Sequence, residues 1–520
     1  MSDEKGVIRK DPGGKLNIAL VYPNTYFVGM SNLGLHTMYR VLNADPAILC
    51  ERFFTDFDRS VEASRPLRDF HIIAFSVSYE LDWINMISIL LKNSIPVRSR
   101  DRKHGPIVLA GGSAATINPE PVADALDICF LGEGEPLASA LSEAFSRSTD
   151  REMLLDRLQD VQGIYIPERT RPVYEDENIG GFTGIKPGIS LMEPFDAPGH
   201  TVILTDKTAF QDMFLAEIAR GCPYHCKFCT AREIYAPFRP VEMRHLQDVF
   251  DKASSSGRKL GLVSTSLNNH PQLSEILSDI SARGIRIAPP SLRLGMISKD
   301  LLDYLKESKV SGVTLAPEVG SDNLRSSLGK AVSNETVLED VTALVSSGIR
   351  DIKLYFMVGL PGEEQSDIEA VIDLTKRIRQ VFIHVSKGNK RIGKISLSVN
   401  TMVPKPHSRY ERAGMIDPGE AKKRIRRIIK GLSPQSNVSV SFEGPKWAYL
   451  QAMIARGDRQ LLDVLIEMAG RDPSQWQEVL KQWPRNPDYY AVRARGREEI
   501  LPWSFYSLYS RSSCRSMEEI

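Results

Sequence analysis

Three cysteines on one short stretch are the residues whose type and spacing point most directly to chemistry. Cys222, Cys226 and Cys229 follow the spacing C-x3-C-x2-C. Cysteine thiolates bind the irons of iron–sulfur clusters, and a cubane cluster normally takes four of them. Three thiolates from one loop therefore leave one iron open to a ligand that is not protein.

Two other uses of these cysteines fit the sequence less well. A zinc site completed by His225 needs a second ligand pair at a typical zinc spacing, and the sequence has none. Disulfides are typical of small secreted chains, whereas this chain has six cysteines in 520 residues and the other three stand singly. The spacing favours a cluster, with zinc and unligated thiols as the alternatives.

The stretch 216–240, in which Phe228 directly precedes the third cysteine, resembles the signature loop of the radical S-adenosylmethionine (SAM) superfamily. The resemblance implies a [4Fe-4S] cluster whose open iron is bound by SAM. It also implies that the reduced cluster cleaves SAM to methionine and a 5′-deoxyadenosyl radical, which removes hydrogen from an unactivated carbon. The electron would come from a reductase, a flavodoxin or a ferredoxin.

Alternating strand and helix patterns surround this loop and must position it. Apolar runs separated by helical segments recur between residues 212 and 412. We expect about six parallel units, a partial (β/α)6 version of the TIM barrel, whose chemistry takes place at the carboxyl ends of its strands. The expected strands after the cysteine loop are 260–264, 285–293, 313–318, 352–359 and 395–399.

The ends of these expected strands resemble the SAM-binding motifs of the superfamily. Glu318, in the sequence TLAPEVGS, matches the acidic residue that binds the SAM ribose, because a carboxylate accepts hydrogen bonds from hydroxyl groups. An ordinary strand-end salt bridge is the alternative for this residue. Gly359 and Leu360 match the turn that packs on adenine. The candidates for the amino and carboxylate groups of SAM are Ser264, Ser291 and Arg293.

A second pattern of strands and helices occupies residues 1–150. Short continuous apolar runs at 17–22, 72–77, 107–109 and 128–131 alternate with helical segments and end in turns. Such runs predict a parallel sheet covered by helices on both faces, as in flavodoxin-like domains. Ligands of these sheets bind at the carboxyl ends of the strands.

The loops at those carboxyl ends are similar to those of the cobalamin-binding domains that precede many radical SAM barrels. One loop departs from the pattern, because Tyr26 replaces the histidine of D-x-H-x-x-G, the lower cobalt ligand in cobalamin mutases. Any bound cobalamin would therefore lack histidine below the metal. The alternative is a flavodoxin-like domain that has lost its cofactor. The implied cobalamin-binding residues are Asn24, Tyr26, Gly29, Ser76, Ser78, Gly111, Gly112, Gly132 and Gly134.

The remaining segments are expected to connect and close these two domains. Residues 151–211 are rich in proline, glycine and acidic side chains, and indicate a linker with some order of its own, including short strands at 163–166 and 201–204. Residues 413–520 predict a small C-terminal α/β domain that begins with a strand at 438–442 and ends in aromatic-rich segments. The expected architecture is thus α/β throughout, with a barrel between two smaller domains.

Charge and hydropathy narrow the class of protein. The formal net charge of +1 argues against a generally basic nucleic-acid binder, and no apolar run approaches a membrane span, so a cytoplasmic enzyme without a membrane partner is expected. Two basic runs, at 376–394 and 422–430, are most simply explained as solvent-exposed faces of helices. A surface for RNA or an acidic protein is the alternative.

Together these resemblances imply a class B radical SAM methyltransferase that uses cobalamin to methylate an unactivated sp3 carbon. A residue of a protein or peptide is the expected substrate, with the glutamine of methyl-coenzyme M reductase as the specific candidate. One alternative is an RNA-modifying enzyme of the methylthiotransferase type, but those carry a second cluster on three N-terminal cysteines and only Cys50 and Cys129 stand here. The other alternative is a cofactor-sensing protein with a structural cluster.

Overall fold

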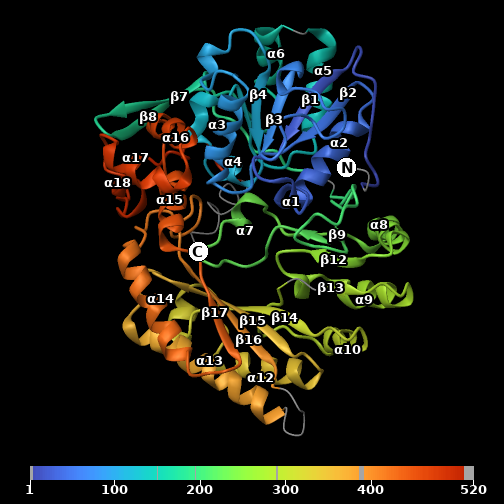
Figure 1. Cartoon of the computed structure of the whole chain (residues 1–520), viewed down its shortest axis with the longest axis vertical. Helices are drawn as coiled ribbons and strands as arrows, with labels where there is room; N and C mark the ends of the chain where they lie inside the picture. The colour runs from blue at the N-terminus through green and yellow to red at the C-terminus, as the bar shows by residue number, and fades with distance from the viewer. Residues whose placement is uncertain (1–3, 149, 194, 289–290, 386–391, 509–520) are drawn as a thin grey trace, which may run out of the picture.

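The computed structural model describes residues 4–148, 150–193, 195–288, 291–385 and 392–508. An N-terminal sheet with helices on both faces stands above a partial barrel, and helices from the end of the described chain lie beside both (Figure 1). Within these residues no helix is long and apolar enough to cross a membrane.

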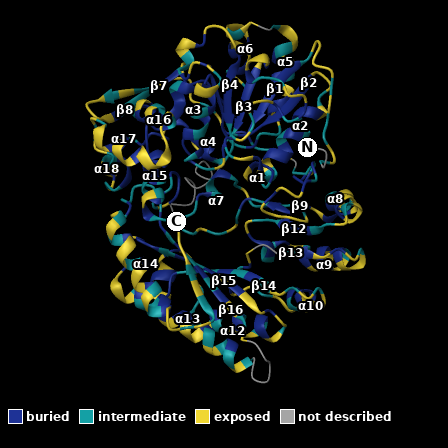
Figure 2. Ribbon diagram, in the orientation of Figure 1, coloured by how far each residue is buried: buried dark blue, intermediate teal, exposed yellow. Residues whose placement is uncertain are grey.

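The N-terminal sheet has the strand order β2-β1-β3-β4-β5-β6, in which all neighbours are parallel except β5 and β6. The apolar runs form strands because they are covered from both sides, and every residue of β1 is buried (Figure 2). The strands are β1 (Leu16–Val21), β2 (Ile48–Phe53), β3 (Ile72–Ser76), β4 (Ile107–Gly111), β5 (Ile128–Phe130) and β6 (Ile164–Tyr165).

The order of the first five strands is that of flavodoxin-like sheets, in which the strand order reverses between β1 and β3. This expectation from the sequence is confirmed, and it places a ligand crevice at the carboxyl ends of those two strands. The helices of this region are α1 (Tyr26–Gly29), α2 (Leu33–Ala44), α3 (Asp82–Lys92), α4 (Ser113–Ile117), α5 (Leu137–Arg147) and α6 (Arg151–Leu158), with 3-10 turns at Leu67–Asp69, Ser99–Asp101 and Glu120–Ala125.

The partial barrel consists of two parallel sheets, β9-β12-β13 and β14-β15-β16-β17, joined by a bridge between Leu292 and Leu315. A partial barrel was expected and is confirmed. Its strands are β9 (Met213–Glu217), β12 (Lys259–Val263), β13 (Ile287–Ala288), β14 (Gly312–Glu318), β15 (Asp351–Val358), β16 (Lys394–Thr401) and β17 (Val438–Ser441).

Helices cover the outer side of this open arc of strands (Figure 1). Burial alternates along β14, β15 and β16, so that one face is packed under helices and the other is only half-buried. The barrel interior is therefore open enough to admit ligands. The helices are α8 (Met243–Ser256), α9 (Leu273–Ala282), α10 (Lys299–Glu307), α11 (Asp322–Ser327), α12 (Asn334–Ser346), α13 (Gln365–Val385) and α14 (Pro418–Leu432), with a 3-10 turn at Leu267–Asn269.

Three expectations about individual elements need correction. The third barrel strand, expected at 285–293, is reduced to β13, and residues 289–290 lie outside the described part. The expected linker has its short strand near 163–166, but this strand joins the N-terminal sheet as β6, and the linker also forms the hairpin of β7 (Thr170–Glu175) and β8 (Asn178–Gly184). The strand expected at 201–204 is replaced by isolated bridges, one of them between Leu204 and Lys5.

The C-terminal segment differs most from expectation, because its strand does not found a separate α/β domain. β17 pairs with β16 and extends the barrel sheet, so the rest of the described tail is helical apart from an isolated bridge at Ile500. Its helices are α15 (Pro445–Ala455), α16 (Leu462–Ala469), α17 (Trp476–Gln482) and α18 (Asp488–Ala491), with 3-10 turns at Arg459–Leu461 and Pro473–Gln475.

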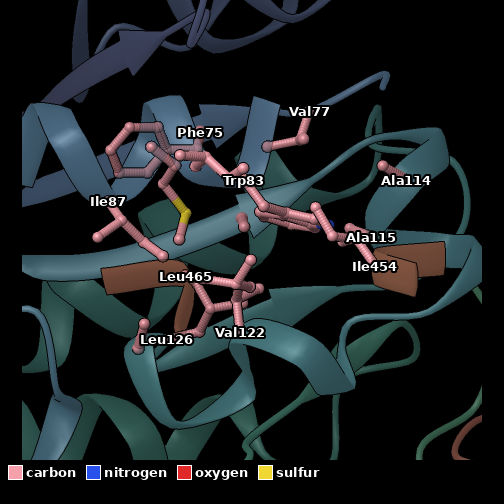
Figure 3. Close-up of a cluster of buried hydrophobic side chains, with 14 of the residues drawn as sticks. Phe75, Val77, Trp83, Ile87, Ala114, Ala115, Val122, Leu126, Ile454 and Leu465 are labelled. Carbon is pink, nitrogen blue, oxygen red and sulfur yellow. The ribbon is translucent and has the colours of Figure 1, made fainter. Parts of the chain in front are cut away.

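These C-terminal helices pack on the N-terminal sheet. Figure 3 shows Ile454 and Leu465 in one buried cluster with Trp83 and Ile87 of α3. Because the tail is joined to the barrel through β17 and to the N-terminal sheet through this core, it holds the two larger parts in a fixed relation. In the aromatic-rich segments Trp476, Tyr490, Trp503 and Tyr506 are buried in the core, whereas Trp483 and Tyr489 are half-buried and Tyr509 lies outside the described residues.

Candidate functional site

The cysteine loop connects β10 (Ala219–Arg220) to α7 (Ala231–Ile234) and faces the N-terminal sheet (Figure 1). Its entry requires glycine, since Gly221 has a φ of +82° and an added Cβ would lie 2.5 Å from the carbonyl oxygen of Tyr235. A turn closes the loop through the amide of Cys229, which donates to the carbonyl oxygen of Cys226 at 3.1 Å. β11 (Arg239–Pro240) pairs antiparallel with β10 and fixes the base of the loop.

All three thiols of this loop are half-buried and none is in a disulfide. Burial raises the pKa of the Cys229 thiol to about 11, and the nearby thiols of Cys226 and Cys222 act in the same direction. An iron ligand must be a thiolate, so binding a cluster would release the protons that this crowding retains. The loop therefore brings the three predicted ligands together.

The described residues do not form a ligand set for a single metal ion. Within the described residues, no three His, Cys, Asp or Glu side chains are gathered closely enough to hold one metal ion. A mononuclear zinc site needs such convergence on one point. The cysteines of a cubane each bind a different iron and stand further apart. The zinc alternative built on His225 thus finds no support in the geometry.

Phe228 and Leu360, predicted from different motifs, belong to the same apolar cluster. Buried Leu360 packs with Val319, Leu324, Leu328 and Met402, and the half-buried Phe228 lies against this group. Gly359, just before Leu360, has a φ of +85°, and a Cβ there would lie 2.4 Å from the side chain of Ile416. The structure therefore places an apolar wall beside the cysteine loop, where adenine was expected.

Glu318 ends β14 in a conformation that non-glycine residues rarely adopt. Its φ is +68°, and the pairing register between β14 and β15 shifts between Leu315 and Glu318. Strained backbone of this kind concentrates at functional sites. The carboxylate lies 2.8 Å from the ammonium group of Lys330, whose side chain is 8% exposed. Sequence reasoning missed Lys330, although its position in the turn after α11 makes it a local neighbour of the strand end.

The remaining candidates for SAM contacts, Ser264, Ser291 and Arg293, have different surroundings. Ser264 lines the cavity described below and accepts a hydrogen bond from the amide of Ser266 at 3.1 Å. Arg293 stacks over the ring of Tyr224 of the cysteine loop, with its guanidinium carbon 3.1 Å from the ring centroid. Ser291 is exposed. Arg293 is thus tied to the cysteine loop through Tyr224.

A cavity of about 500 Å³ opens between the N-terminal sheet and the cysteine loop. Its inner end is apolar and lies between the sheet and helices α2 and α5, with Leu20, Leu109 and Leu137 in its wall. Its outer end is polar and reaches Arg220 and Gly221, next to the first cysteine. This volume falls in the range of about 300–1,000 Å³ that is typical of small-molecule sites.

Most of the predicted cobalamin loops line this cavity. It lies between β1 and β3, where the strand order reverses and where such sheets bind ligands. The glycines allow close approach, since Gly112 has a φ of +105° and a Cβ there would lie 2.5 Å from the carbonyl oxygen of Val77. The predicted residues that line the cavity are Ser76, Ser78, Gly111, Gly112, Gly132 and Gly134.

The other three predicted cobalamin residues are not part of the cavity lining. Tyr26 is buried and donates to a carboxylate oxygen of Glu4 at 2.5 Å, and burial together with this bond raises the pKa of Tyr26 to about 12. Its ring packs edge-on against Phe54. Asn24 donates to Asp82 at 2.9 Å, and Gly29 lies against the ring of Phe54. These three residues therefore do not line the cavity to which Ser76 and Gly112 contribute.

Asn32 takes their place at the cavity wall. It caps α2 by accepting from the amide of Leu35 at 3.0 Å, and its side-chain amide lies 3.2 Å from the hydroxyl of Ser78. An asparagine before a helical pattern is a capping signal, which would have singled out this residue in the sequence. Glu133, Glu135 and Tyr235 also line the cavity and were not predicted.

The second basic run lies in α14, and the first lies only partly in a helix. Part of the first run lies in α13, and its residues 386–391 lie outside the described part of the chain. In α14, Arg424 and Arg427 pair with Glu363 and Glu369 at 2.5 and 2.6 Å. The exposed cations that remain on α14 include Lys422, Arg426 and Lys430.

Two family models match the chain. Residues 216–375 match the radical SAM superfamily, and residues 34–167 match the N-terminal region of radical SAM proteins. These ranges contain the cysteine loop with four of the barrel strands and most of the flavodoxin-like sheet.

Two relatives are similar to this chain over large parts of their length. An uncharacterized protein of Methanocaldococcus jannaschii is 30% identical over 459 residues, which is 86% of this chain and 89% of the relative. An uncharacterized methyltransferase of Pyrococcus horikoshii is 20% identical over 283 residues, or 52% of this chain and 58% of the relative.

A solved structure shares the fold. The cobalamin-dependent S-adenosylmethionine radical enzyme OxsB, with aqua-cobalamin and S-adenosylmethionine bound, superposes with a TM-score of 0.54 at 14% identity. The match covers 76% of this chain and 60% of that chain. At this identity the likeness concerns architecture, a parallel N-terminal sheet preceding a radical SAM barrel.

Proposed function

This chain belongs to the radical SAM superfamily, and we propose that it is a cobalamin-dependent methyltransferase that methylates an unactivated sp3 carbon. Membership of the superfamily implies a [4Fe-4S] cluster and SAM. The observation that carries the cobalamin part is the cavity, which joins the ligand crevice of a flavodoxin-like sheet directly to the cysteine loop.

The residues of this chain fit the three expected groups, which are the [4Fe-4S] cluster, SAM and cobalamin. Cys222, Cys226 and Cys229 supply three thiols for a cluster that leaves one iron open. Glu318 offers a carboxylate to hydroxyl donors, and the wall of Phe228 and Leu360 offers an apolar surface to a nucleobase.

The cavity fits the nucleotide tail of cobalamin rather than the whole cofactor. Its apolar inner end suits an aromatic heterocycle, and glycines such as Gly111 and Gly112 let the ligand approach the backbone. The corrin ring is too large for a volume of about 500 Å³ and would stay at the mouth of the cavity. The mouth is also where Arg220 and Ser264 bring the barrel to the sheet.

When bound, the cluster and SAM supply hydrogen-atom abstraction, and methylcobalamin supplies a methyl group. The protein binds and orients these groups and limits the access of water. Phe228 and the buried Leu360 cover the cluster loop on one side. The half-buried inner faces of β15 and β16 leave room in the barrel for a substrate side chain.

We further propose that the substrate is a residue of a protein or peptide. The glutamine of methyl-coenzyme M reductase, suggested by the class B resemblance, is the substrate to test first. A reductase, a flavodoxin or a ferredoxin would supply the electron.

The RNA-modifying alternative is favoured by the exposed cations of α14, among them Lys422 and Arg426. It is disfavoured by the positions of the N-terminal cysteines. Cys50 and Cys129 lie in β2 and β5, and both are fully buried. They cannot hold a second cluster of the methylthiotransferase kind without unfolding the sheet. A cofactor-sensing protein with a structural cluster would retain cobalamin but would not cleave SAM.

Cobalamin retention tests the proposal. The chain is reconstituted anaerobically with iron, sulfide and hydroxocobalamin, desalted, and measured for cobalt and visible absorption. We expect the wild type to retain cobalamin and Ser76→Trp, which fills the cavity mouth, to lose most of it. Ser139→Trp, on the exposed side of α5, is the matched control and should bind as the wild type does. A wild type that retains none would favour the RNA-modifying alternative.

A further inference from the structure

A group of buried charges joins the cavity to the cysteine loop. Arg220 contacts three carboxylates, those of Glu133 at 3.1 Å, Glu135 at 2.7 Å and Glu217 at 2.8 Å. A second arginine, Arg239, also donates to Glu133, at 3.0 Å. Glu133 and Glu135 lie in the loop after β5 of the N-terminal sheet, whereas Glu217 ends barrel strand β9 and the two arginines lie in the paired strands β10 and β11 beside the cysteine loop. The group therefore crosses between the two parts of the molecule.

This group is built as a rigid unit. The side chains of Arg220 and Glu133 are 11% and 2% exposed. The ring of Phe195 lies against both arginines, with centroids 4.6 Å from the guanidinium carbon of Arg220 and 5.4 Å from that of Arg239. A guanidinium can hold several carboxylates in fixed directions, which the single ammonium of lysine cannot do. The geometry thus depends on arginine at position 220.

Arg220 sits close to both sites. Only Gly221 separates it from Cys222, and Gly221 is confined between the carbonyl oxygens of Tyr235 and Pro237. The backbone between Arg220 and Cys222 therefore has little freedom to move. On the other side, Glu133 and Glu135 lie in the loop after β5 and line the cavity. One side chain therefore connects the loop that would hold the cluster with the loop that would face cobalamin.

We propose that Arg220 is a positioning residue that holds the cysteine loop in register with the cavity loop through Glu133 and Glu135. The rate of SAM cleavage then depends on Glu133 and Glu135, although these carboxylates lie in the loop after β5 of the N-terminal sheet and not in the cluster loop. This inference rests on the proposed function for the use of the cluster, but it does not require that cobalamin binds.

The rate of 5′-deoxyadenosine formation from SAM tests this role. Arg220→Lys, Glu135→Gln and the double variant are compared after anaerobic reconstitution, with iron content and the electron paramagnetic resonance (EPR) spectrum of the reduced, SAM-bound cluster as further readouts. Glu143→Gln, which removes an exposed ion pair of α5 with Arg147, is the matched control. Circular dichroism verifies that each variant is folded.

Each single variant should lower the rate about tenfold, the size of one lost charge-assisted hydrogen bond. The double variant should be no slower than Arg220→Lys, because the two residues act through the same contact. Iron content should not change, and the EPR spectrum of each single variant should differ from that of the wild type. The control should match the wild type in all three measurements.

Wild-type rates in both single variants would overturn the proposal, as would fully additive losses. Loss of iron in the folded single variants would also overturn it, because the residues would then be needed for cluster binding rather than for positioning. A chain that cleaves SAM but retains no cobalamin would remove the proposed methyl transfer and leave this test intact. In a chain that does not cleave SAM, identical EPR spectra for wild type and variants would overturn it.

Discussion

The ammonium group of Lys330 lies 2.8 Å from the carboxylate of Glu318, and the two side chains are 8% and 13% exposed. Lys330 also donates to the carbonyl oxygen of Ala316, at 2.5 Å. The pair therefore fixes a negatively charged group at the end of β14, in the left-handed backbone conformation of Glu318. A carboxylate held in this way is prepared to receive hydroxyl donors without further reorganisation.

We expect Glu318→Gln to raise the dissociation constant of SAM about tenfold, because the amide forms weaker hydrogen bonds than the carboxylate. Equilibrium dialysis with labelled SAM on the reconstituted chain measures this effect. Glu339→Gln, an exposed residue of α12, is the control and should bind SAM as the wild type does. An unchanged dissociation constant for Glu318→Gln would leave Glu318 with only its salt bridge to Lys330.

The lower face of any bound cobalt should lack a protein nitrogen ligand. No histidine is among the described residues that line the cavity, and Tyr26 is turned into the core against Phe54. The EPR spectrum of the Co(II) form should therefore show no splitting by a nitrogen nucleus. Free cobalamin with its own base bound serves as the reference for a split signal. A nitrogen-split spectrum in the cobalamin-loaded protein would contradict a site in which neither a histidine nor the cofactor's own base binds the lower face of cobalt.

Stability should fall in mildly acidic solution because of His36. Its ring is buried, accepts from the amides of Val202 and Ile203 and contacts the carbonyl oxygen of Met30. Burial lowers the pKa of His36 to about 4, below the value near 6.5 of an unfolded chain. The unfolded state therefore takes up the proton first, so this contribution is complete above pH 6.5 and declines as the pH falls toward 4.

The free energy of unfolding should fall by roughly 1.4 kcal/mol per pH unit as the pH drops from 6.5 toward 4. Urea unfolding of wild type and His36→Gln at pH 7 and pH 5 measures it, with exposed His104→Gln as control. His200, whose pKa burial also lowers to about 4, leaves part of the slope in place. The same pH dependence in wild type and His36→Gln would show that His36 does not contribute.

Local motifs account for what the sequence predicts well here. The cysteine spacing is contained in one loop, so Cys222 and Cys229 come together whatever the rest of the chain does. Strand ends of a parallel sheet converge by topology, which is why Ser78 and Gly112 meet at one cavity although they lie far apart in the sequence. Such placements follow from periodicity and turn residues alone.

Side-chain direction and edge pairing depend on distant contacts, so the local sequence does not reveal them. Tyr26 has the spacing of a cobalt ligand, but its hydroxyl is bound by Glu4, a residue from the start of the chain. β17 has the pattern of an independent strand, but the open edge of β16 gives it a partner in the barrel. Lys330 carries no motif and is revealed only by its distance to Glu318.

Formation of 5′-deoxyadenosine tests the central claim most directly. The anaerobically reconstituted chain is reduced with dithionite in the presence of SAM, and the product is quantified by chromatography. We predict that the wild type and His225→Ala, which removes the proposed zinc ligand, form the product. Replacing Cys222, Cys226 and Cys229 together by alanine should abolish it along with bound iron. Product formation by the triple variant at the wild-type rate would contradict the assignment of this loop as the cluster site.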